Sequence, residues 1–446
     1  MINIPIVIIS FNNHKYVKNT IDQLENIDSK ILSNIIIMDN NSSEANTINF
    51  LNTTKHKVIR NSENKGPWIE RYEDFYDSLP NKFILTDPDL EFNSNLPQNF
   101  IEILSNLSDK FECHKIGFAL DIKDFDQMYN TTYYNNQTIY DWEKQFWSNK
   151  IDDLNYELYN AEIDTTFCLI NKQASHKSSK RIRIADNFTA KHIPWYKKNP
   201  FYNEYEKYIY GTNSYSTISK LFLTHIYNNY HIISKNDEKF LIDVSISKNI
   251  NFWKNIYSTW EKETFTIFDK YLSKNKIFID FGADIGAMSI YGSRKSKHVY
   301  SIENDILSVK DLSLNLSNNS NNNNYTIINR SFSINDVINS YNINPNDIAL
   351  IKVDIKGEEE KILKGLYDLN NKHKIPLYIV IHYKIWKDSN LNRFPFLTQK
   401  HKNDINNNQL TYLLLNGTDI KTINSNSKLK NNSLSKLLKW IKSNFT

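Results

Sequence analysis

Phe-Ile-Leu-Thr-Asp-Pro-Asp-Leu-Glu-Phe, residues 83–92, is the stretch that decides the fold of the first half of the chain. Its apolar start predicts a short buried strand, and Pro88 ends that strand in a stiff turn. Alternate side chains of an extended turn project to one side, so Asp87 and Asp89 can converge. Two carboxylates at a strand end suit Mg²⁺ or Mn²⁺ carrying a diphosphate. An isolated Asp-x-Asp is more often a solvated loop, so the surrounding sequence has to decide.

Length and composition limit the classes of protein to consider. A chain of 446 residues predicts two domains, and 40% hydrophobic residues are enough for real cores. The net charge of +4 comes with dispersed lysines, which does not indicate nucleic-acid binding. Cys113 and Cys168 have no zinc-ligand spacing and are expected to be reduced core thiols. Asparagine makes up roughly a seventh of the residues, and its clusters at 318–324 and 403–408 are typical of low-complexity loops.

The sequence predicts a soluble, cytoplasmic protein. The first strand begins by Ile4, which leaves no room for a signal peptide. No apolar run approaches the length of a membrane span, so we expect no transmembrane segment.

Strand-like and helical segments alternate through the first half of the chain. Apolar runs at 4–9, 35–37 and 58–59 precede the run at 83–85, and alternation of this kind predicts a parallel sheet with right-handed crossovers. Ligands of such sheets lie beyond the carboxyl ends of the strands. The polar or glycine residues expected at those ends are Asn12, Asp39, Gly66, Asp87 and Asp89. Five such residues at consecutive strand ends outline a ligand-binding crevice.

These motifs together resemble a GT-A-fold glycosyltransferase of the family-2 type over about residues 1–235. The resemblance rests on Ile-Ser-Phe-Asn-Asn (9–13), Met-Asp-Asn-Asn-Ser (38–42), Glu-Asn-Lys-Gly-Pro (63–67) and Thr-Asp-Pro-Asp-Leu (86–90). Two later segments also match, Ile-Asp-Thr-Thr-Phe-Cys-Leu-Ile (163–170) and Ala-Lys-His-Ile-Pro-Trp-Tyr (190–196).

The resemblance implies a nucleotide-sugar donor, a glycan or glycoconjugate acceptor and a divalent metal. The donor contacts it implies are Asn12, Asp39, Gly66 and Asp87, with Asp39 on the base. The metal ligands it implies are Asp87, Asp89 and His192, with Asp89 as the main one. An inverting transferase also needs a carboxylate base near the acceptor hydroxyl. Asp164 is the preferred candidate and Asp121 the alternative.

A second nucleotide-binding pattern follows a polar, lysine-rich junction at 234–258. The apolar strand at 277–279 leads into a turn with Gly282 and Gly286, where a helix begins, and the next strand ends in Glu303. This order is that of a nucleotide-binding half-fold whose terminal acid takes the ribose hydroxyls. The glycine spacing differs from Gly-x-Gly-x-x-Gly, which argues against a nicotinamide cofactor.

This half resembles the FkbM-type methyltransferases, and residues 250–395 form the predicted domain. The resemblance rests on Trp-Glu-Lys-Glu-Thr (260–264), Phe-Ile-Asp-Phe-Gly-Ala-Asp-Ile-Gly (278–286), Ser-Ile-Glu (301–303) and Leu-Ile-Lys-Val-Asp-Ile-Lys-Gly-Glu-Glu (350–359). It implies S-adenosylmethionine bound by Asp280, Gly282, Gly286 and Glu303. It also implies that Asp354 and His382 face the reacting hydroxyl.

Two features of this half depart from the family pattern. Asp284 stands where asparagine or an aromatic residue is common, and the Asn-rich segment between Asn315 and Ile334 is short where relatives carry another strand. Residues 396–446 form an Asn/Lys-rich extension, in which Leu434, Leu437, Leu438 and Ile441 predict one apolar helix face for docking.

The sequence as a whole predicts an α/β chain of two domains, a GT-A fold followed by a Rossmann-like S-adenosylmethionine-dependent methyltransferase fold. The predicted activities are metal-dependent sugar transfer and sugar O-methylation. A non-catalytic second domain and a non-catalytic scaffold stay open as alternatives. The sequence does not identify the sugar, the acceptor, the stereochemical outcome or the oligomeric state.

Overall fold

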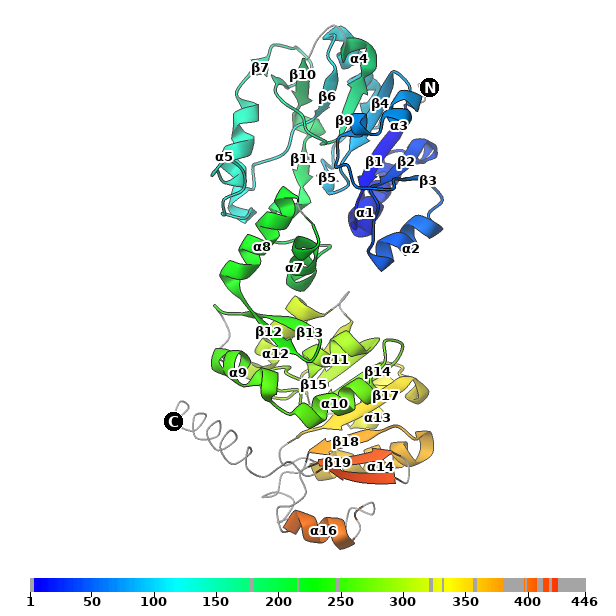
Figure 1. Ribbon diagram of the computed structural model, residues 1–446, viewed down its shortest axis with the longest axis vertical. Coiled ribbons are helices and arrows are strands. Elements are labelled where there is room, and N and C mark those ends of the chain that lie inside the picture. The colour runs from blue at the N-terminus through cyan, green and yellow to red at the C-terminus, as the bar shows by residue number, and fades with distance from the viewer. Residues whose placement is uncertain are drawn as a thin grey trace. The chain divides into compact units, whose positions relative to one another are not determined.

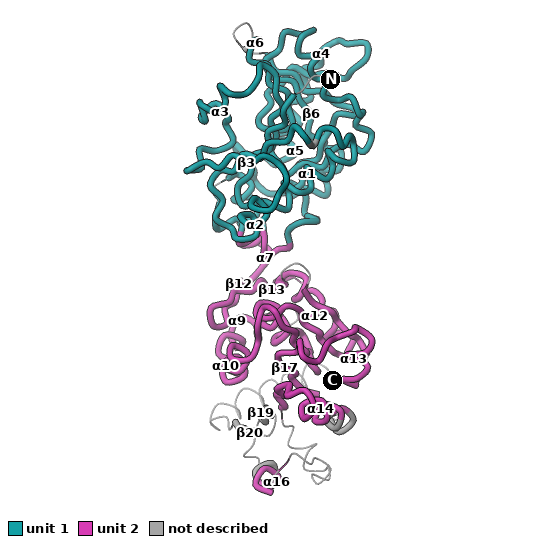
Figure 2. Tube along the Cα trace, turned by 90° about the vertical axis from the view of Figure 1, so that its right-hand side faces the viewer, with its two compact units in different colours: residues 1–202, 210–225 teal, residues 203–209, 226–446 magenta. Residues whose placement is uncertain are grey.

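The computed structural model divides the chain into two compact units (Figure 2). Unit 1 comprises Met1–Tyr202 and Tyr210–His225, and unit 2 comprises Asn203–Ile209 and Ile226–Thr446. The residues that the structure describes are 4–175, 180–214, 216–245, 249–320, 324–330, 333–355, 359–380, 397, 399–406, 412–416 and 419–423. The division falls inside the first predicted domain, 1–235, and the functional boundaries stay predictions.

Unit 1 contains a nine-stranded mixed sheet (Figure 1). In spatial order its strands are β3 (Lys57–Arg60), β2 (Ile35–Asp39), β1 (Ile6–Ser10), β4 (Lys82–Thr86), β9 (Cys168–Asn171), β6 (Lys115–Phe118), β10 (Arg181–Ile184), β8 (Leu158–Asn160) and β7 (Lys150–Ile151). The first four strands are parallel, as the sequence predicts. Most of strand β9 comes from the motif at 163–170. This strand lies in the same sheet, antiparallel to β4 and β6.

The apolar runs of unit 1 are continuous because alternate residues enter different cores. In β1, Ile6 and Ile8 belong to one buried cluster and Val7 and Ile9 to another. Helix α1 (His14–Ile27) packs its apolar side into the first cluster. The other helices of this unit are α2 (Ala45–Thr53), α3 (Glu73–Ser78), α4 (Phe100–Lys110), α5 (Ile139–Lys144) and α6 (Lys172–Ser175). Both faces of the strands are therefore withdrawn from water.

A small ribbon carries the end of the opening stretch. Strand β5 (Leu90–Phe92) pairs antiparallel with β11 (Ala190–His192), so that Leu90 lies opposite His192. Helices α7 (Glu204–Thr212) and α8 (Thr217–Asn229) follow in the chain, and each has residues in both units. The ribbon brings the acidic turn and the later histidine together from about a hundred residues apart.

Unit 2 is built on a seven-stranded sheet, whose first five strands are parallel. In spatial order the strands are β16 (Tyr325–Ile328), β15 (His298–Ile302), β14 (Ile277–Phe281), β17 (Ile348–Val353), β18 (Leu377–Val380), β19 (Tyr412–Asn416) and β20 (Asp419–Ile423). The helices are α9 (Ile250–Asn255), α10 (Lys262–Tyr271), α11 (Ser289–Lys295), α12 (Ile306–Asn319), α13 (Ile334–Ser340), α14 (Glu359–His373) and α16 (Gln399–Asn406). Both units are thus mixed α/β structures with parallel strands at their centre.

The structure corrects three expectations about the segments between the motifs. The polar junction at 234–258 contains part of a hairpin, β12 (Tyr230–Lys235) and β13 (Glu238–Asp243), and helix α9. The segment between Asn315 and Ile334 does contain a strand, β16, paired with β15. The asparagine cluster at 318–324 is not entirely a low-complexity loop, because helix α12 ends at Asn319 and that residue is fully buried. The C-terminal helix predicted around Leu434 lies outside the described residues.

Asn319 joins helix α12 to the β12–β13 hairpin. Its Oδ1 accepts from the backbone N–H of Leu241 at 2.7 Å, and its Nδ2 donates to the carbonyl of Leu241 at 2.9 Å and to that of Asn315 at 2.8 Å. The amide therefore pairs with Leu241 as a neighbouring strand would.

In the described part of the chain, no helix has the length and apolar character that crossing a membrane requires.

Replacement of Asn319 by alanine tests this joint. Two buried backbone groups of Leu241 lose their partner, and each costs on the order of 1–3 kcal/mol, so we expect Asn319→Ala to lower the free energy of unfolding of unit 2 by about 2–4 kcal/mol. Asn335→Ala is the matched control, because Asn335 is exposed on α13. Urea unfolding followed by tryptophan fluorescence measures both. Equal stability of the two variants would contradict the assignment.

Candidate functional site

The carboxyl ends of the parallel strands in unit 1 meet at one edge of the sheet. The pairing places Ser10 opposite Asp39 and Ile8 opposite Thr86. Asn12, Asp39 and Asp87 follow or end these strands, so the polar residues predicted for the crevice do fall at neighbouring strand ends.

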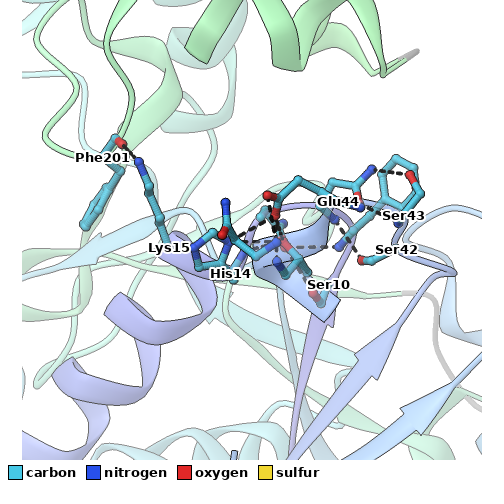
Figure 3. A network of polar contacts seen from close by, with 12 residues as sticks. Ser10, His14, Lys15, Ser42, Ser43, Glu44 and Phe201 are labelled. Atoms are coloured by element: carbon cyan, nitrogen blue, oxygen red, sulfur yellow. Dashed lines mark hydrogen bonds and ion pairs between the residues drawn. The ribbon is translucent and has the colours of Figure 1, made fainter. Parts of the chain in front are cut away.

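Asn12 and Asp39 organise the turn that leads into α2, and Figure 3 labels Ser42, Ser43 and Glu44 of this turn. Asn12 has a left-handed backbone with a φ of 54°, and its Oδ1 accepts from the N–H groups of Ser43 and Glu44, each at 2.8 Å. Asp39 is buried, and its Oδ1 accepts from the Ser42 hydroxyl at 2.5 Å. Figure 3 shows the side chains of His14 and Glu44 converging beside this turn, with Nδ1 of His14 3.4 Å from Oε2 of Glu44.

The turn at Gly66 is tied to the same edge by two residues that the sequence did not single out. Asn40 is buried, donates to the Gly66 carbonyl at 3.0 Å and accepts from the Tyr72 hydroxyl at 2.7 Å. Gly66 has a φ of 84°, and a Cβ there would meet the Trp68 ring at 2.7 Å. The motif at 38–42 contains Asn40, but only the fold reveals its partners.

Thr165, which directly follows the candidate base Asp164, forms two hydrogen bonds with Asp87. The Thr165 hydroxyl donates to Asp87 Oδ2, and the Asp87 N–H donates to the Thr165 carbonyl at 2.8 Å. Burial, and after it the neighbouring Asp89 carboxylate, raises the pKa of Asp87 to about 8. Asp164, next to Thr165, is exposed and also raises this pKa. The structure thus brings Asp87, Asp89 and Asp164 within electrostatic range of one another.

Asp89 and His192 form the closest pair in this acidic group. His192 Nε2 lies 3.3 Å from Asp89 Oδ2, and both side chains are mostly buried. Burial lowers the pKa of His192, but the charges of Asp89 and Asp87 outweigh it and the pKa is raised. Within the described residues, Asp89 Oδ1 and His192 Nδ1 are buried without a hydrogen-bond partner. No group of three or more His, Cys, Asp or Glu side chains that could hold a metal ion is present in the described part of the chain.

Helix α1 fixes the acidic turn through hydrogen bonds from two of its side chains. The Thr20 hydroxyl donates to the Pro88 carbonyl at 2.6 Å, and the Gln23 amide donates to the Leu90 carbonyl at 2.9 Å. Gln23 Oε1 also accepts from the Phe92 N–H at 2.7 Å. The sequence analysis missed both residues, because their partners lie about seventy positions later in the chain.

Asp121, the alternative base, lies beside the ribbon. Its backbone N–H donates to the Ala190 carbonyl at 2.8 Å, and its carboxylate accepts from the Lys123 N–H at 2.9 Å. Asp164 is exposed and directly precedes Thr165, whose hydroxyl donates to Asp87.

In unit 2, Asp280 lies beneath the glycine turn. It is fully buried, its Oδ2 accepts from the Ser289 hydroxyl at 2.7 Å, and its Oδ1 lies 2.9 Å from the ammonium of the buried Lys352. Lys352 also donates to the Gly282 carbonyl at 2.8 Å. Burial lowers the pKa of Lys352, but the charge of Asp280 outweighs it and the pKa is raised. The Asp280–Lys352 pair therefore fastens β14 to β17 under the turn.

The two glycines of the turn are required by the packing of the chain itself. A Cβ on Gly282 would lie 2.0 Å from the Asp354 carbonyl oxygen, and one on Gly286 would lie 2.8 Å from Leu312. Both have positive φ, of 74° and 87°. Close backbone approach thus explains the glycines whether or not a ligand is bound.

Glu303 closes the turn from the end of β15. Its carboxylate accepts from the N–H groups of Asp284, Asn304 and Asp305, each at 2.8 Å. A carboxylate has about four acceptor positions, so Glu303 retains room for another donor. Ile306 and Leu307, directly after it, are exposed. Asp354 lies half-buried at the end of β17, with Oδ2 3.7 Å from Lys352, and His382 lies outside the described residues.

Comparison with known proteins does not identify a family. No protein-family model matches the chain, and no curated protein matches it. Solved structures with partial similarity include precorrin 8w decarboxylase from Methanobacterium thermoautotrophicum, at 18% identity and a TM-score of 0.23. The match covers 27% of this chain and 63% of that enzyme, less than two thirds of its length.

Two further structures are an rRNA methylase from Streptococcus thermophilus and an RNA methyltransferase from Salinibacter ruber in complex with S-adenosyl-L-homocysteine. The first has 19% identity and a TM-score of 0.26, and the match covers 31% of this chain and 80% of that one. The second has 11% identity and a TM-score of 0.21, with 27% and 75% covered. At these identities and TM-scores the similarity supports no conclusion about function.

The structural role of Asp280 can be tested through its partner. Lys352→Met leaves a buried carboxylate without its counter-charge, so we expect it to destabilise unit 2 by about 3–5 kcal/mol. Lys352→Met with Asp280→Asn should recover part of that loss, because the amide still accepts from Ser289 and carries no charge. Urea unfolding of the single and double variants gives the comparison. A double variant no more stable than Lys352→Met would contradict the pairing.

Proposed function

We propose that unit 1 transfers a sugar from a nucleotide-sugar donor to a glycan acceptor with the help of a divalent metal ion. The observation that carries the proposal is the Asp89–His192 pair at the carboxyl edge of the sheet, with Asp87 beside it. The edge also carries the Asn12 and Asp39 turn, where the family-2 resemblance expects the nucleotide. The resemblance and the geometry support the same edge as the site.

The acidic turn fits a divalent cation. Asp89 Oδ1 is buried without a hydrogen-bond partner among the described residues. Burial, and after it the neighbouring Asp89 carboxylate, raises the pKa of Asp87. Asp89 would be the main ligand and Asp87 or His192 a second one, because the described residues form no group of three such side chains around an ion. Sites for Mg²⁺ commonly use one or two carboxylates and complete the shell with substrate phosphates and water. When bound, the ion would neutralise the charge that develops on the departing nucleoside diphosphate.

The remaining residues of unit 1 would bind the donor and move one proton. Asp39 would accept hydrogen bonds from the base, and the Asn12 and Gly66 turns would shape the walls around the nucleotide. Asp164 would take the proton of the acceptor hydroxyl as the new glycosidic bond forms, which requires hydrogen-bond reach of that hydroxyl. Its exposure next to the clamped Asp87–Thr165 contact supports this role.

The metal role of Asp89 gives a direct test. Asp89→Ala removes the main ligand and the several kcal/mol of charge stabilisation that the metal supplies, so Mn²⁺-dependent hydrolysis of a nucleotide sugar should fall by about a hundredfold or more. The fold should persist, because the residue lies on a turn at the edge of the sheet. Asp152→Ala, an exposed aspartate of the same unit, is the control and should keep its activity. Full activity in Asp89→Ala would remove the basis of the proposal.

A second function, methyl transfer from S-adenosylmethionine to a sugar hydroxyl, is favoured by the arrangement of unit 2. The glycine turn and Glu303 lie at adjacent strand ends, and the exposed Ile306 and Leu307 follow the acid. The residues present fit the cofactor: Glu303 would accept from its ribose and the two apolar side chains would face its adenine. When bound, the cofactor would supply the methyl group. Asp354 and His382 would orient the acceptor hydroxyl.

Two observations make Gly282 and Asp280 weak support for this second function. The glycine is explained by the Asp354 backbone, and Asp280 is fully buried against Lys352. Both would shape the cofactor turn from below. A unit 2 that only supports unit 1, and a non-catalytic scaffold, are the alternatives.

Cofactor binding distinguishes these readings. A charged hydrogen bond is worth about 1.5–3 kcal/mol, so Glu303→Ala should weaken S-adenosylmethionine binding by about tenfold or more in calorimetry. Asp237→Ala, an exposed acid in the β12–β13 turn, should bind as the wild type does. Absence of binding by the wild type at millimolar cofactor would leave unit 2 without the methyltransferase role.

A further inference from the structure

A cavity of about 270 Å³ lies against the β5–β11 ribbon of unit 1. Its polar lining comes from Glu91, Asn93, Ser94, Asp121, Thr189 and Lys191, and the buried Phe92 and Ala190 complete it. None of these residues belongs to the donor and metal site proposed above.

The cavity shares its strands with the acidic turn. Glu91 follows Asp89 by two residues, which corresponds to about 7 Å along an extended chain. Lys191 directly precedes His192, and Lys191 and Glu91 are register partners on the ribbon. The cavity and the acidic turn are therefore carried by the same two-stranded ribbon.

The walls of the cavity are held by a dense set of hydrogen bonds. Asn93 donates from Nδ2 to the Thr189 hydroxyl at 2.9 Å and to the Asp186 carbonyl at 3.1 Å. Asp186 has a left-handed backbone with a φ of 55°, which is uncommon for a residue other than glycine. The Tyr196 hydroxyl donates to the Asp121 carbonyl at 3.2 Å. These bonds fix Asn93, Thr189 and Asp121, three residues of the cavity lining.

The charges of the cavity select the kind of ligand. Glu91 and Asp121 contribute two carboxylates, whereas the ammonium of Lys191 already pairs with Asp124 at 2.5 Å. This excess of negative charge disfavours phosphates and acidic sugars. The lining is mostly polar, which disfavours a lipid chain. Carboxylate acceptors together with the Ser94 hydroxyl and the Lys191 ammonium as donors are suited to the hydroxyl groups of a neutral sugar.

We propose that this cavity binds one neutral sugar ring of the acceptor and holds it beside the metal site. Glu91 and Asp121 accept from its hydroxyl groups, and Lys191 and Ser94 donate to its oxygens. The size is close to the lower limit of ordinary ligand pockets, as expected for a single ring rather than an oligosaccharide. The assignment of the ring to the acceptor rests on the proposed sugar transfer.

Ligand-detected NMR with methyl glycosides tests the cavity on the full chain. The probes are the methyl glycosides of glucose, galactose, mannose and N-acetylglucosamine at millimolar concentration. We expect saturation transfer to at least one of them in the wild type, and binding weakened by about tenfold in Glu91→Ala and in Asp121→Asn. Glu91 is exposed, so its substitution does not threaten the fold, and the exposed Glu102 on α4 provides the matched control Glu102→Ala. This control should bind as the wild type does.

Several outcomes would overturn the proposal. One is the absence of transfer to every glycoside in the wild type, and another is binding as strong as that of the wild type in both cavity variants. A third is displacement of the glycoside by a nucleotide sugar with Mn²⁺, which would place the donor's own sugar in the cavity. Nucleotide-sugar hydrolysis by the wild type is measured separately. Failure of hydrolysis with intact glycoside binding refutes the transferase role and leaves the cavity as a sugar site, whereas the converse refutes the cavity alone.

Discussion

The burial of Asp87 two residues from Asp89 is the constraint around which unit 1 is built. Removing the Asp87 carboxyl from water in a proline turn is costly, and burial, with the nearby Asp89 charge as the second cause, raises its pKa to about 8. The chain keeps the two carboxyl groups together by fixing the backbone from three sides. Helix α1 holds the turn through Thr20 and Gln23, the Thr165 segment clamps Asp87, and strand β11 brings His192 against Asp89. The proposed cation would account for a turn that is costly to assemble and that leaves the Asp89 Oδ1 oxygen without a hydrogen-bond partner among the described residues.

The sequence predicted the strands of this site and the polar residues at their ends better than the side chains that hold the acidic turn in place. Continuous apolar runs identify β1, β2 and β4, because a strand buried on both faces has no polar side to interrupt the pattern. The polar residues at their ends then follow from the shared direction of the strands. Thr20 and Gln23 could not be found in the same way. They lie on a helix surface, and the carbonyls and amide that they bind are about seventy residues away, so no local pattern marks them.

The asparagine-rich segment shows how composition misled the prediction. A run of asparagines between a helix and a strand is typical of a solvent-exposed loop, and the sequence analysis left out β16 on that ground. The side chain of Asn319 instead satisfies the backbone of Leu241, a residue on the hairpin that the sequence assigned to a polar junction. Both errors have one cause. An amide side chain can replace a strand partner, and only the arrangement of the two segments in space decides whether it does.

The strand-end acids of the two units differ in what neutralises them, and that difference separates the chemistry each unit can support. In unit 2 the buried Asp280 has Lys352 at 2.9 Å, so its charge is already compensated by the chain and it does not call for a metal ion. The acid that stays accessible there is Glu303, bonded by three backbone N–H groups that still leave it able to accept from a hydroxyl. In unit 1 the partner of Asp89 is a histidine, whose nitrogen can itself ligate a cation when neutral, and the second carboxylate adds to the charge. The proposals for the two units rest on this difference: a ligand that offers hydroxyl donors for Glu303, and a cation with the phosphates that it carries for Asp89.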